Sequence, residues 1–498
     1  MQNLVLELKQ VEKNYLSKEV LTIEDLKVYE NEKIGVVGAN GEGKSTLLNI
    51  IAGVEQADTG QVNRLIDFKY YKQMEDVLSY DYTQVDPEYL SRLGVPAHAA
   101  EHFSGGEQTR LRLAEYFSTY SFGLLMDEPT THLDTEGIQF LIDQLKYYYG
   151  TLIVVSHNRY FLDEVVDTIW EVDAGKVCVY SGNYTAYKEQ KEAERLEQEK
   201  AYNQFVKEKT RLEQAAKDKQ QQANKLSQVS LKQKNRAIKP DRLSSSKQKD
   251  TVQKAAHKAA KAIEKRAEQL ESVDRVEEER GIQFPQPKSL DIHNPFPIMA
   301  EDLSLSFDGK ELFKETSFQF PLGKRIAITG PNGSGKSTLL KAIVNESEGI
   351  TLSNKIVFSV YKQLDYQLNV NKTVLEYLKQ DSLFEEPVIR SVLNNLGFKQ
   401  NEVMKKQAKD LSGGEATRLV IAKLFTDPSN VLVLDEPTNF IDVQTIEALE
   451  RLMKSYKGTI LFTSHDHYFV EHVADQVWRI EDKQLKLVDY ELQEKNKK

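Results

Sequence analysis

The sequence predicts an α/β protein in which two copies of one domain stand in tandem, joined by a long antiparallel α-helical hairpin. In both halves of the chain, short Val, Ile and Leu runs alternate with helical stretches, which is typical of a parallel sheet covered by helices. A glycine-rich octapeptide occurs once in each half, at residues 38–45 and 330–337. Between the halves, residues 188–285 contain few Gly or aromatic residues and many Lys, Glu, Gln and Ala residues, which favour helix. We therefore expect three parts, at residues 1–187, 188–290 and 291–498.

The bulk composition narrows the classes of protein to which the chain can belong. With 498 residues it is too long for one hydrophobic core, and 40% hydrophobic residues suffice for packed domains. A net charge of −10 argues against a generally basic nucleic-acid-binding protein, but it is compatible with a local basic patch. Cys178 is the only cysteine, so no internal disulfide can form. We find no signal peptide and no run of roughly 20 apolar residues, and therefore expect a cytoplasmic protein without a membrane segment.

The two halves align with a nearly constant offset, which indicates a duplicated domain. Lys44 and Lys336 lie 292 positions apart, and Gln73 and Gln363 lie 290 positions apart. Further along the chain the offset becomes 308, which places an insertion of 18 residues in the second copy. The pairs that share this larger offset are Ser104 and Ser412, Asp127 and Asp435, and His157 and His465.

Each octapeptide fits the phosphate-binding loop, in which the backbone amides of a glycine-rich turn surround phosphate groups. In the first copy an apolar strand at 33–37 precedes the loop and a helical run at 46–51 follows it, so the positive end of a helix faces the phosphates. The loop lysine should reach the β- and γ-phosphates of a nucleotide, and the serine should bind Mg²⁺. The expected nucleotide-binding residues are Gly38, Asn40, Gly41, Gly43, Lys44, Ser45 and Thr46 in the first copy, and Gly330, Asn332, Gly333, Gly335, Lys336, Ser337 and Thr338 in the second.

Acidic residues at the ends of two apolar runs complete the predicted chemistry. Asp127 and Asp435 stand where a strand-end carboxylate can hold Mg²⁺, directly or through water. The next residues, Glu128 and Glu436, are placed to act as general bases that polarise the attacking water. A histidine lies 30 residues after the aspartate in both copies and is expected to sense the γ-phosphate, at His157 and His465.

The segment between the copies has the periodicity of two helices and a polarised charge. Apolar residues recur at helical spacing in 196–212 and in 252–273, which predicts two arms. A first helix over about 188–225 would be on the order of 55 Å long. A proline and a run of serines predict an irregular tip at about 226–250. Residues 206–266 carry 18 Lys and Arg against 6 Asp and Glu, which indicates an anionic partner; a linker kept soluble by its charge is the alternative.

These motifs together resemble the ATP-binding-cassette family, whose signature loop is matched by Phe-Ser-Gly-Gly-Glu at 103–107 and by Leu-Ser-Gly-Gly-Glu at 411–415. The resemblance implies that the two cassettes dimerise head to tail within one chain. Each ATP would then lie between one phosphate loop and the opposite signature, so that Lys44 works with Ser412 and Lys336 with Ser104. The signature residues expected to bind ATP are Ser104, Gly105, Gly106 and Glu107, and Ser412, Gly413, Gly414 and Glu415.

The same resemblance assigns further residues. Gln73 and Gln363 match the family's glutamine loops, which implies contacts to Mg²⁺ and a part in catalysis. Tyr15 and Phe307 match positions that stack on adenine. The D-loop segments differ between the copies, at 131–134 and 439–442, and Asn158 follows the first histidine where Asp466 follows the second. Since every catalytic position is present twice, we expect two competent but unequal sites, with D-loop aspartates at Asp134 and Asp442.

The order of cassette, charged hairpin and cassette resembles the ABC-F group of translation factors, as does the run Gly-Asn-Tyr-Thr-Ala-Tyr at 182–187. The linker run at 232–247, continued at 254–256 and 263–266, is similar to the macrolide–streptogramin resistance (Msr) branch of that group. The short interval between Gln73 and Ser104 is similar too, because housekeeping members carry an inserted arm there.

The resemblance implies a ribosomal protection protein that acts as a monomer with ATP and Mg²⁺. The ATP-bound form would bind the E site of the 70S ribosome, where basic side chains neutralise rRNA phosphates. The linker tip would then act on the P-site tRNA and the peptidyl-transferase and exit-tunnel region, so that a macrolide or streptogramin leaves, and ATP hydrolysis would release the factor. The tip residues expected to matter are Leu231, Lys232, Lys234, Arg236, Ile238, Lys239, Arg242 and Leu243.

Two other functions are compatible with these motifs. A housekeeping ABC-F translation factor would affect growth or initiation without any drug. A soluble twin-cassette ATPase of an importer or a DNA-repair system would need a membrane partner or a DNA-facing surface, for which the sequence offers no specific cue.

Overall fold

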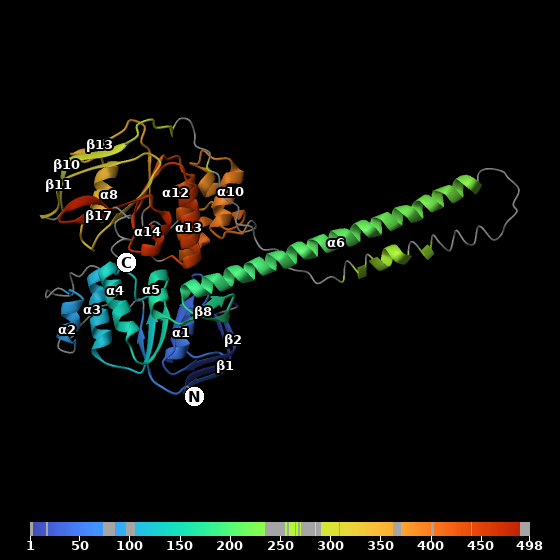
Figure 1. Cartoon of the computed structure of the whole chain (residues 1–498), viewed down its shortest axis with the longest axis horizontal. Helices are drawn as coiled ribbons and strands as arrows, with labels where there is room; N and C mark the ends of the chain where they lie inside the picture. The colour runs from blue at the N-terminus through green and yellow to red at the C-terminus, as the bar shows by residue number, and fades with distance from the viewer. Residues whose placement is uncertain are drawn as a thin grey trace, which may run out of the picture. The chain divides into compact units, whose positions relative to one another are not determined.

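The computed structural model describes residues 3–15, 18–72, 85–95, 105–234, 254–255, 258–263, 265–266, 269, 284, 290–307, 309–361, 370–399, 403–439 and 441–488. The chain forms two compact units, of which one combines Met1–Tyr187 with Arg280–Lys498 and the other comprises Lys188–Glu279. The first unit contains both copies of the repeated domain, here called the first and second cassettes (Figure 1). The predicted α/β fold with tandem cassettes and an intervening long helix is confirmed.

The first cassette is built on a six-stranded sheet in the order β5-β6-β7-β3-β8-β9, parallel except for the antiparallel pair β8 and β9. The cassette also contains an antiparallel sheet in the order β2-β1-β4, and apolar residues of the two sheets pack in one core. Its strands are β1 (Leu4–Tyr15), β2 (Lys18–Tyr29), β3 (Lys33–Val37), β4 (Thr59–Arg64), β5 (Phe68–Tyr71), β6 (Gly123–Asp127), β7 (Thr151–Val155), β8 (Thr168–Asp173) and β9 (Lys176–Ser181). Its helices are α1 (Lys44–Ala52), α2 (Pro87–Arg92), α3 (Gly105–Ser118), α4 (Thr135–Lys146) and α5 (Arg159–Val165).

The second cassette repeats this topology, with sheet orders β14-β15-β16-β12-β17-β18 and β11-β10-β13. Its strands are β10 (Ile298–Phe307), β11 (Lys310–Phe320), β12 (Arg325–Thr329), β13 (Ile350–Leu352), β14 (Phe358–Tyr361), β15 (Val431–Leu434), β16 (Thr459–Thr463), β17 (Gln476–Glu481) and β18 (Gln484–Val488). Its helices are α8 (Lys336–Val344), α9 (Val374–Lys379), α10 (Glu386–Asn395), the 3₁₀ helix η4 (Ala408–Asp410), α12 (Gly413–Thr426), α13 (Val443–Ser455) and α14 (His467–Val473). Helices α9 and α10 lie in the interval where the offset between the copies increases, and Thr373 starts α9 with a capping box.

The parallel strands bring distant motifs to one edge of each sheet. In the first cassette β7 lies between β6 and β3, with Val155 paired to Asp127 on one side and to Val36 on the other. The phosphate loop, the acidic pair and the histidine therefore all follow strands that end at the same edge, where ligands of such sheets bind. The second cassette has the same arrangement, because β16 lies between β15 and β12.

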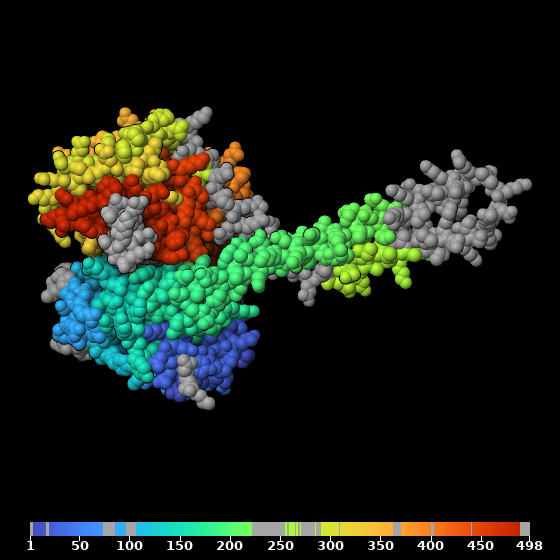
Figure 2. Space-filling view, viewed as in Figure 1, coloured from blue at the N-terminus to red at the C-terminus, as the bar shows by residue number. Residues whose placement is uncertain are grey.

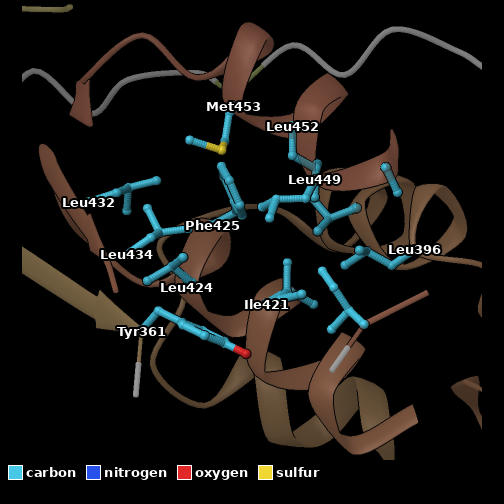
Figure 3. Packing of buried hydrophobic residues seen from close by; sticks show 14 of the residues in the cluster. Tyr361, Leu396, Ile421, Leu424, Phe425, Leu432, Leu434, Leu449, Leu452 and Met453 are labelled. Carbon is cyan, nitrogen blue, oxygen red and sulfur yellow. The ribbon is translucent and has the colours of Figure 1, made fainter. Parts of the chain in front are cut away.

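Apolar strands and helix faces form the cores that hold these edges in place. Strands β7 and β16 are buried along their whole length, as expected for the centre of a covered parallel sheet. In the second cassette Leu432 and Leu434 from β15 meet Phe425 of α12 and Met453 of α13 (Figure 3). Burying such side chains stabilises the fold by about 1.5–3 kcal/mol each.

Helix α6 (Tyr184–Lys234) enters the second unit and is the longest helix of the described chain. Its 51 residues correspond to about 76 Å, longer than the predicted first arm, because the run after residue 225 contains no Gly or Pro before the helix ends. Ion pairs three residues apart, such as Arg195–Glu192 and Arg211–Glu208, support the exposed helix by a few tenths of a kcal/mol each. Residues 254–255, 258–263 and 265–266 are helical pieces of the returning arm. Among the described residues, no helix is both long and apolar enough to cross a membrane.

Candidate ATP-binding sites

The first phosphate loop connects β3 to α1 through glycines that no other residue could replace without strain. Gly43 has φ +101°, and a Cβ there would lie 2.9 Å from Val20 Cγ1. A Cβ at Gly38 would lie 2.3 Å from the carbonyl oxygen of Val172. No side chain caps α1, so the first amides of that helix are available to an anion. The loop thus has the form of a phosphate cradle.

The lysine of each loop is buried and held by loop carbonyl groups. Lys44 Nζ donates to the carbonyl oxygens of Gly38 (2.7 Å) and Ala39 (2.9 Å). Lys336 Nζ donates to those of Gly330 (2.8 Å) and Pro331 (3.1 Å). Burial lowers the pKa of both ammonium groups, with nearby carboxylates opposing the shift. A γ-phosphate at this position would supply the counter-charge that two neutral carbonyl groups lack.

The glutamates behind the two loops are largely buried, with 11% of the Glu128 side chain and 14% of the Glu436 side chain exposed, and they lie close to the histidines. His157 Nε2 lies 3.3 Å from Glu128 Oε1, and His465 Nε2 lies 3.4 Å from Glu436 Oε1. Burial raises the pKa of Glu128 to about 8 and that of Glu436 to about 7, with the loop lysine opposing the shift in each case. Burial also lowers the pKa of His157 to about 3 and that of His465 to about 4. A carboxyl group with a pKa near neutrality is suited to accept a proton from water.

Both general-base candidates have an unusual backbone. Glu128 has φ +50° and Glu436 has φ +47°, a left-handed conformation that costs on the order of 1 kcal/mol for a residue with a Cβ. The backbone amide of Glu128 donates to the carbonyl group of Val155, and that of Glu436 donates to Thr463 Oγ1. Strain that recurs at the same place in both copies is typical of functional positions.

Ser45 and Asp127 fit the chemistry of a Mg²⁺ site. Their side chains are hydrogen-bonded to each other and lie next to the phosphate loop. Mg²⁺ prefers such oxygen ligands, and usually takes only one or two from the protein when phosphates and water supply the rest. No cluster of three acidic, His or Cys side chains that could hold a metal alone occurs among the described residues. In the second cassette Asp435 occupies the equivalent place and accepts a hydrogen bond of 2.8 Å from Thr463.

Each phosphate loop contacts the D-loop and the signature of the opposite cassette. The amide of Asn40 donates to Asp442 Oδ2 (2.9 Å), and that of Asn332 donates to Asp134 Oδ2 (3.2 Å). The other carboxylate oxygen of each aspartate caps the helix that it starts, α13 or α4. Gly106 of the first signature faces Asn332, and Gly414 of the second faces Asn40. The space-filling view shows the two cassettes lying against each other (Figure 2).

A cavity of about 680 Å³ lies at the first loop, and its lining comes from both cassettes. Residues of the first cassette that line it include Tyr15, Lys44, Asp127, Glu128 and His157. The second cassette contributes Thr438, Asn439, Ile446, His465 and Asp466. A smaller cavity of about 550 Å³ is lined by Gly330, Pro331, His465 and 134–136, and Lys336 is not among its lining residues.

The two aromatic residues expected at adenine differ in their surroundings. Tyr15 lines the larger cavity, and its hydroxyl donates to the Glu55 carboxylate at 2.7 Å. Phe307 is 66% exposed and lines neither cavity. Tyr15 thus lines one of these two cavities and Phe307 lines neither, and stacking on adenine stays a prediction for both residues.

Ser412 starts α12 with a capping box and donates from Oγ to Glu415 Oε2 at 2.7 Å.

Several predicted residues lie outside the described part of the chain. Gln73, Ser104 and Gln363 are among them, and so is most of the linker tip, from residue 235 to 250. The tip residues Leu231, Lys232 and Lys234 belong to α6, but their side chains are likewise not described. Their expected roles therefore stay predictions.

One pair that the motifs do not reveal connects the cassettes next to the first site. Arg159 of α5 lies with Nη2 2.8 Å from Glu450 Oε1 of α13, and both residues are buried. The sequence does contain a signal for this pair, which appears when the two copies are aligned at the offset of 308. His467 is the counterpart of Arg159, and Ile142 is the counterpart of Glu450. A charged residue whose counterpart in the other copy is uncharged predicts an ionic partner that only its own copy requires.

The packing around the signature glycines leads to a test of the two sites. A Cβ at Gly106 would lie 3.0 Å from both Asn332 Nδ2 and the carbonyl oxygen of His132, whereas one at Gly414 would lie 3.5 Å from Asn40 Cβ. We expect Gly106→Ala to weaken ATP-dependent association of the cassettes by about 1–3 kcal/mol, the usual cost of overpacking. Gly414→Ala, the matched control, should have little effect. ATP titration of a hydrolysis-deficient protein measures both, and equal losses would contradict the difference.

Comparisons with known proteins agree with this geometry. A model described as ABC transporter matches residues 21–131 and 313–439. The chain is 45% identical over 461 residues to the erythromycin resistance ATP-binding protein MsrA of Staphylococcus epidermidis. The aligned region covers 92% of this chain and 94% of MsrA. It is 32% identical to the ribosome protection protein VmlR of Bacillus subtilis strain 168, over 90% of this chain and 81% of VmlR.

The fold also has a counterpart among solved structures. The structure of RNase-L Inhibitor matches 96% of this chain and 90% of its own length, with a TM-score of 0.64 at 18% identity, which is a likeness of fold alone. The extended similarity to MsrA and VmlR carries the assignment further, since it spans nearly the whole chain. The chain therefore belongs to the ABC-F family of ATP-binding-cassette proteins, and its resemblance to the MsrA-like members is confirmed.

Proposed function

We propose that this protein is an ATP-hydrolysing ribosomal protection factor that removes macrolide or streptogramin antibiotics from the ribosome. The observation that carries the proposal is the 45% identity to MsrA over 92% of the chain. The uncovered 8% is shorter than the linker, so the similarity includes linker residues as well as the cassettes. MsrA is named for erythromycin resistance and VmlR for ribosome protection.

The ATP reaction follows from the residues at each loop. Lys44 or Lys336 would hold the β- and γ-phosphates, and Glu128 or Glu436 would take a proton from the water that attacks the γ-phosphorus. The bond between the γ-phosphorus and the bridging oxygen breaks, which gives ADP and phosphate. Ser45 and Asp127, or Ser337 and Asp435, would hold Mg²⁺, which would neutralise phosphate charge when bound. His157 or His465 would donate to the γ-phosphate from the same edge of the sheet.

Closure and linker action complete the proposal. ATP between a loop and the opposite signature adds to the D-loop contacts and keeps the cassettes together, as Asn40 with Asp442 illustrates. The closed monomer would bind the E site of the 70S ribosome in the cytoplasm, where the +12 charge of residues 206–266 favours rRNA. The tip would disturb the P-site tRNA and the drug site so that the antibiotic leaves. Hydrolysis would open the cassettes and release the factor.

Expression in a susceptible bacterial host tests this function. We expect the wild-type protein to raise the minimum inhibitory concentration of erythromycin and to restore translation in a drug-inhibited extract. A Lys44→Ala, Lys336→Ala variant should do neither, because it lacks the phosphate-binding cations. Growth or initiation defects without any drug protection would favour the housekeeping alternative and contradict the proposal.

A further inference from the structure

A buried polar cluster joins the cassettes beside the first ATP site. The Arg159 guanidinium is 2% exposed, lies 2.8 Å from the Glu450 carboxylate and sits over the Tyr468 ring at 4.8 Å. On the next turn of α13 towards its start, Glu447 accepts a hydrogen bond of 3.4 Å from the Tyr184 hydroxyl. We call these five residues the interface cluster. Arg159 and Tyr184 come from the first cassette, and the other three come from the second.

The interface cluster is connected to the first ATP site at three points. Arg159 lies two residues after His157, which lines the cavity at the first loop. Glu450 and Glu447 belong to the helix that Asp442 starts, and Asp442 accepts from the amide of Asn40 in the first phosphate loop. Ile446, on the same helix, lines the cavity itself. A movement of α13 relative to the first loop must therefore change the interface cluster.

The interface cluster also contains the start of the linker helix. Tyr184 is the first residue of α6 and is 3% exposed. Its ring lies 5.7 Å from that of Tyr187, whose hydroxyl donates to Glu171 Oε1 at 2.8 Å. Tyr187 thus fixes the first turn of α6 to the first cassette, whereas Tyr184 connects the same turn to the second. Only when the cassettes are together can both connections exist.

Among the described residues, the second ATP site has no ion pair equivalent to that of Arg159 with Glu450. At the positions related by the offset of 308, His467 replaces Arg159 and Ile142 replaces Glu450. His467 is exposed and meets Tyr160 with ring centroids 6.1 Å apart. Gln139, in place of Glu447, lies 3.5 Å from the Tyr160 hydroxyl, a residue of its own cassette. Helices α5 and α14 face each other (Figure 1), but a buried ion pair occurs on one side of the contact.

We propose that the first turn of α6 becomes fixed when the cassettes close around the first ATP site, because closure assembles the interface cluster. Arg159 is the positioning residue of this cluster. This rests on the ATP-driven closure within the proposed function, and adds that the two ATP sites differ in what they control. Removing one partner of a buried ion pair leaves an uncompensated charge, whereas replacing both by apolar side chains is often tolerated. The pair should therefore behave as a unit in the closed state.

Distance measurements on the purified protein without ribosomes test the proposal. Spin labels are attached at Ala193→Cys on α6 and at Lys454→Cys on α13, two exposed positions, in a Cys178→Ser background. The distance between the labels reports the position of the linker helix relative to the second cassette. Glu128→Gln and Glu436→Gln prevent turnover in this parent protein. We expect ATP to narrow the distance distribution. Arg159→Met should raise the half-saturating ATP concentration roughly 100-fold, and the double variant Arg159→Met, Glu450→Met should recover to within about tenfold of the parent.

Two variants separate the parts of the proposal. Tyr184→Phe should leave the half-saturating ATP concentration within about threefold of the parent and broaden the distribution, because the cassettes close without fixing α6. His467→Met, the matched control at the second site, should change neither quantity. If Arg159→Met fails to fold, Arg159→Lys replaces it, because lysine keeps the charge. We expect Arg159→Lys to raise the half-saturating ATP concentration roughly tenfold.

Four results would overturn the proposal: no ATP-dependent change in the parent, no loss in the Arg159 variants, equal losses at Arg159 and His467, or an unchanged distribution in Tyr184→Phe. Because no ribosome is present, a failure of drug protection cannot produce any of them.

Discussion

A protein that carries Glu128→Gln and Glu436→Gln should bind ATP, stay closed and sediment with 70S ribosomes, and its phosphate release should fall by about 10²–10⁴-fold. The substitution removes the proton acceptor at both sites but keeps the size of the side chain. Oε1 of Glu128 and Oε1 of Glu436 are buried and lie near the histidine Nε2, at 3.3 and 3.4 Å, without hydrogen-bond geometry. The burial that raises the pKa of both glutamates prepares them to accept a proton. Without hydrolysis the closed form has no route to opening.

Phosphate release and ribosome sedimentation, measured in ATP and in ADP, check this result. The single variants are the internal controls, since each retains one competent site. An additional Lys44→Ala and Lys336→Ala exchange should abolish cosedimentation, because nucleotide binding is lost. If the double glutamine variant stays in the supernatant with ATP, the ribosome proposal is wrong, whatever its residual turnover.

Replacing residues 231–243 by a Gly/Ser segment of equal length should abolish rescue of translation from erythromycin and leave ATP turnover within about twofold of wild type. The exchange removes basic and apolar side chains from the tip of a segment whose charge is +12, so it removes counterion release and contacts near the drug site together. The composite ATP sites lie in the other unit and retain their residues.

Translation of a reporter in an erythromycin-inhibited extract measures the rescue, and phosphate release in the same extract measures turnover. The matched control is Glu192→Ala with Arg195→Ala, which removes an exposed ion pair from the described part of α6 at a cost of a few tenths of a kcal/mol. That control should rescue like wild type. Full rescue by the Gly/Ser variant would show that the tip sequence has no part in protection.

The residues that repeated motifs mark were accessible from the sequence. Gly38 and Gly43 adopt backbone and packing that only glycine allows, so chemistry, fold and sequence pattern coincide there. The difference between Asn158 and Asp466, which the sequence suggests as a source of inequality, has a simpler meaning. Asn158 caps α5 through Phe161 and Asp466 caps α14 through Phe469, so the two side chains perform the same structural task.

Tertiary contacts explain what the sequence could not provide. The ion pair of Arg159 with Glu450 joins positions far apart in the chain and has no motif. The proline and the serine run predict an irregular tip from about residue 226, whereas α6 continues to Lys234, because residues 226–234 contain neither Gly nor Pro. Tyr15 and Phe307 end the equivalent strands β1 and β10, yet Tyr15 lines the larger of the two cavities described above and Phe307 lines neither.

The ion pair of Arg159 with Glu450 makes the halves of the chain non-interchangeable. A hybrid chain of two first cassettes would retain both phosphate loops and both D-loop aspartates, but its second half would present Ile142 to Arg159 in place of Glu450. A buried guanidinium without an acid costs about 3–5 kcal/mol, a large share of the stability of a domain. The order of the two cassettes, with the linker following the first, is thus required by a non-covalent contact as well as set by the covalent chain.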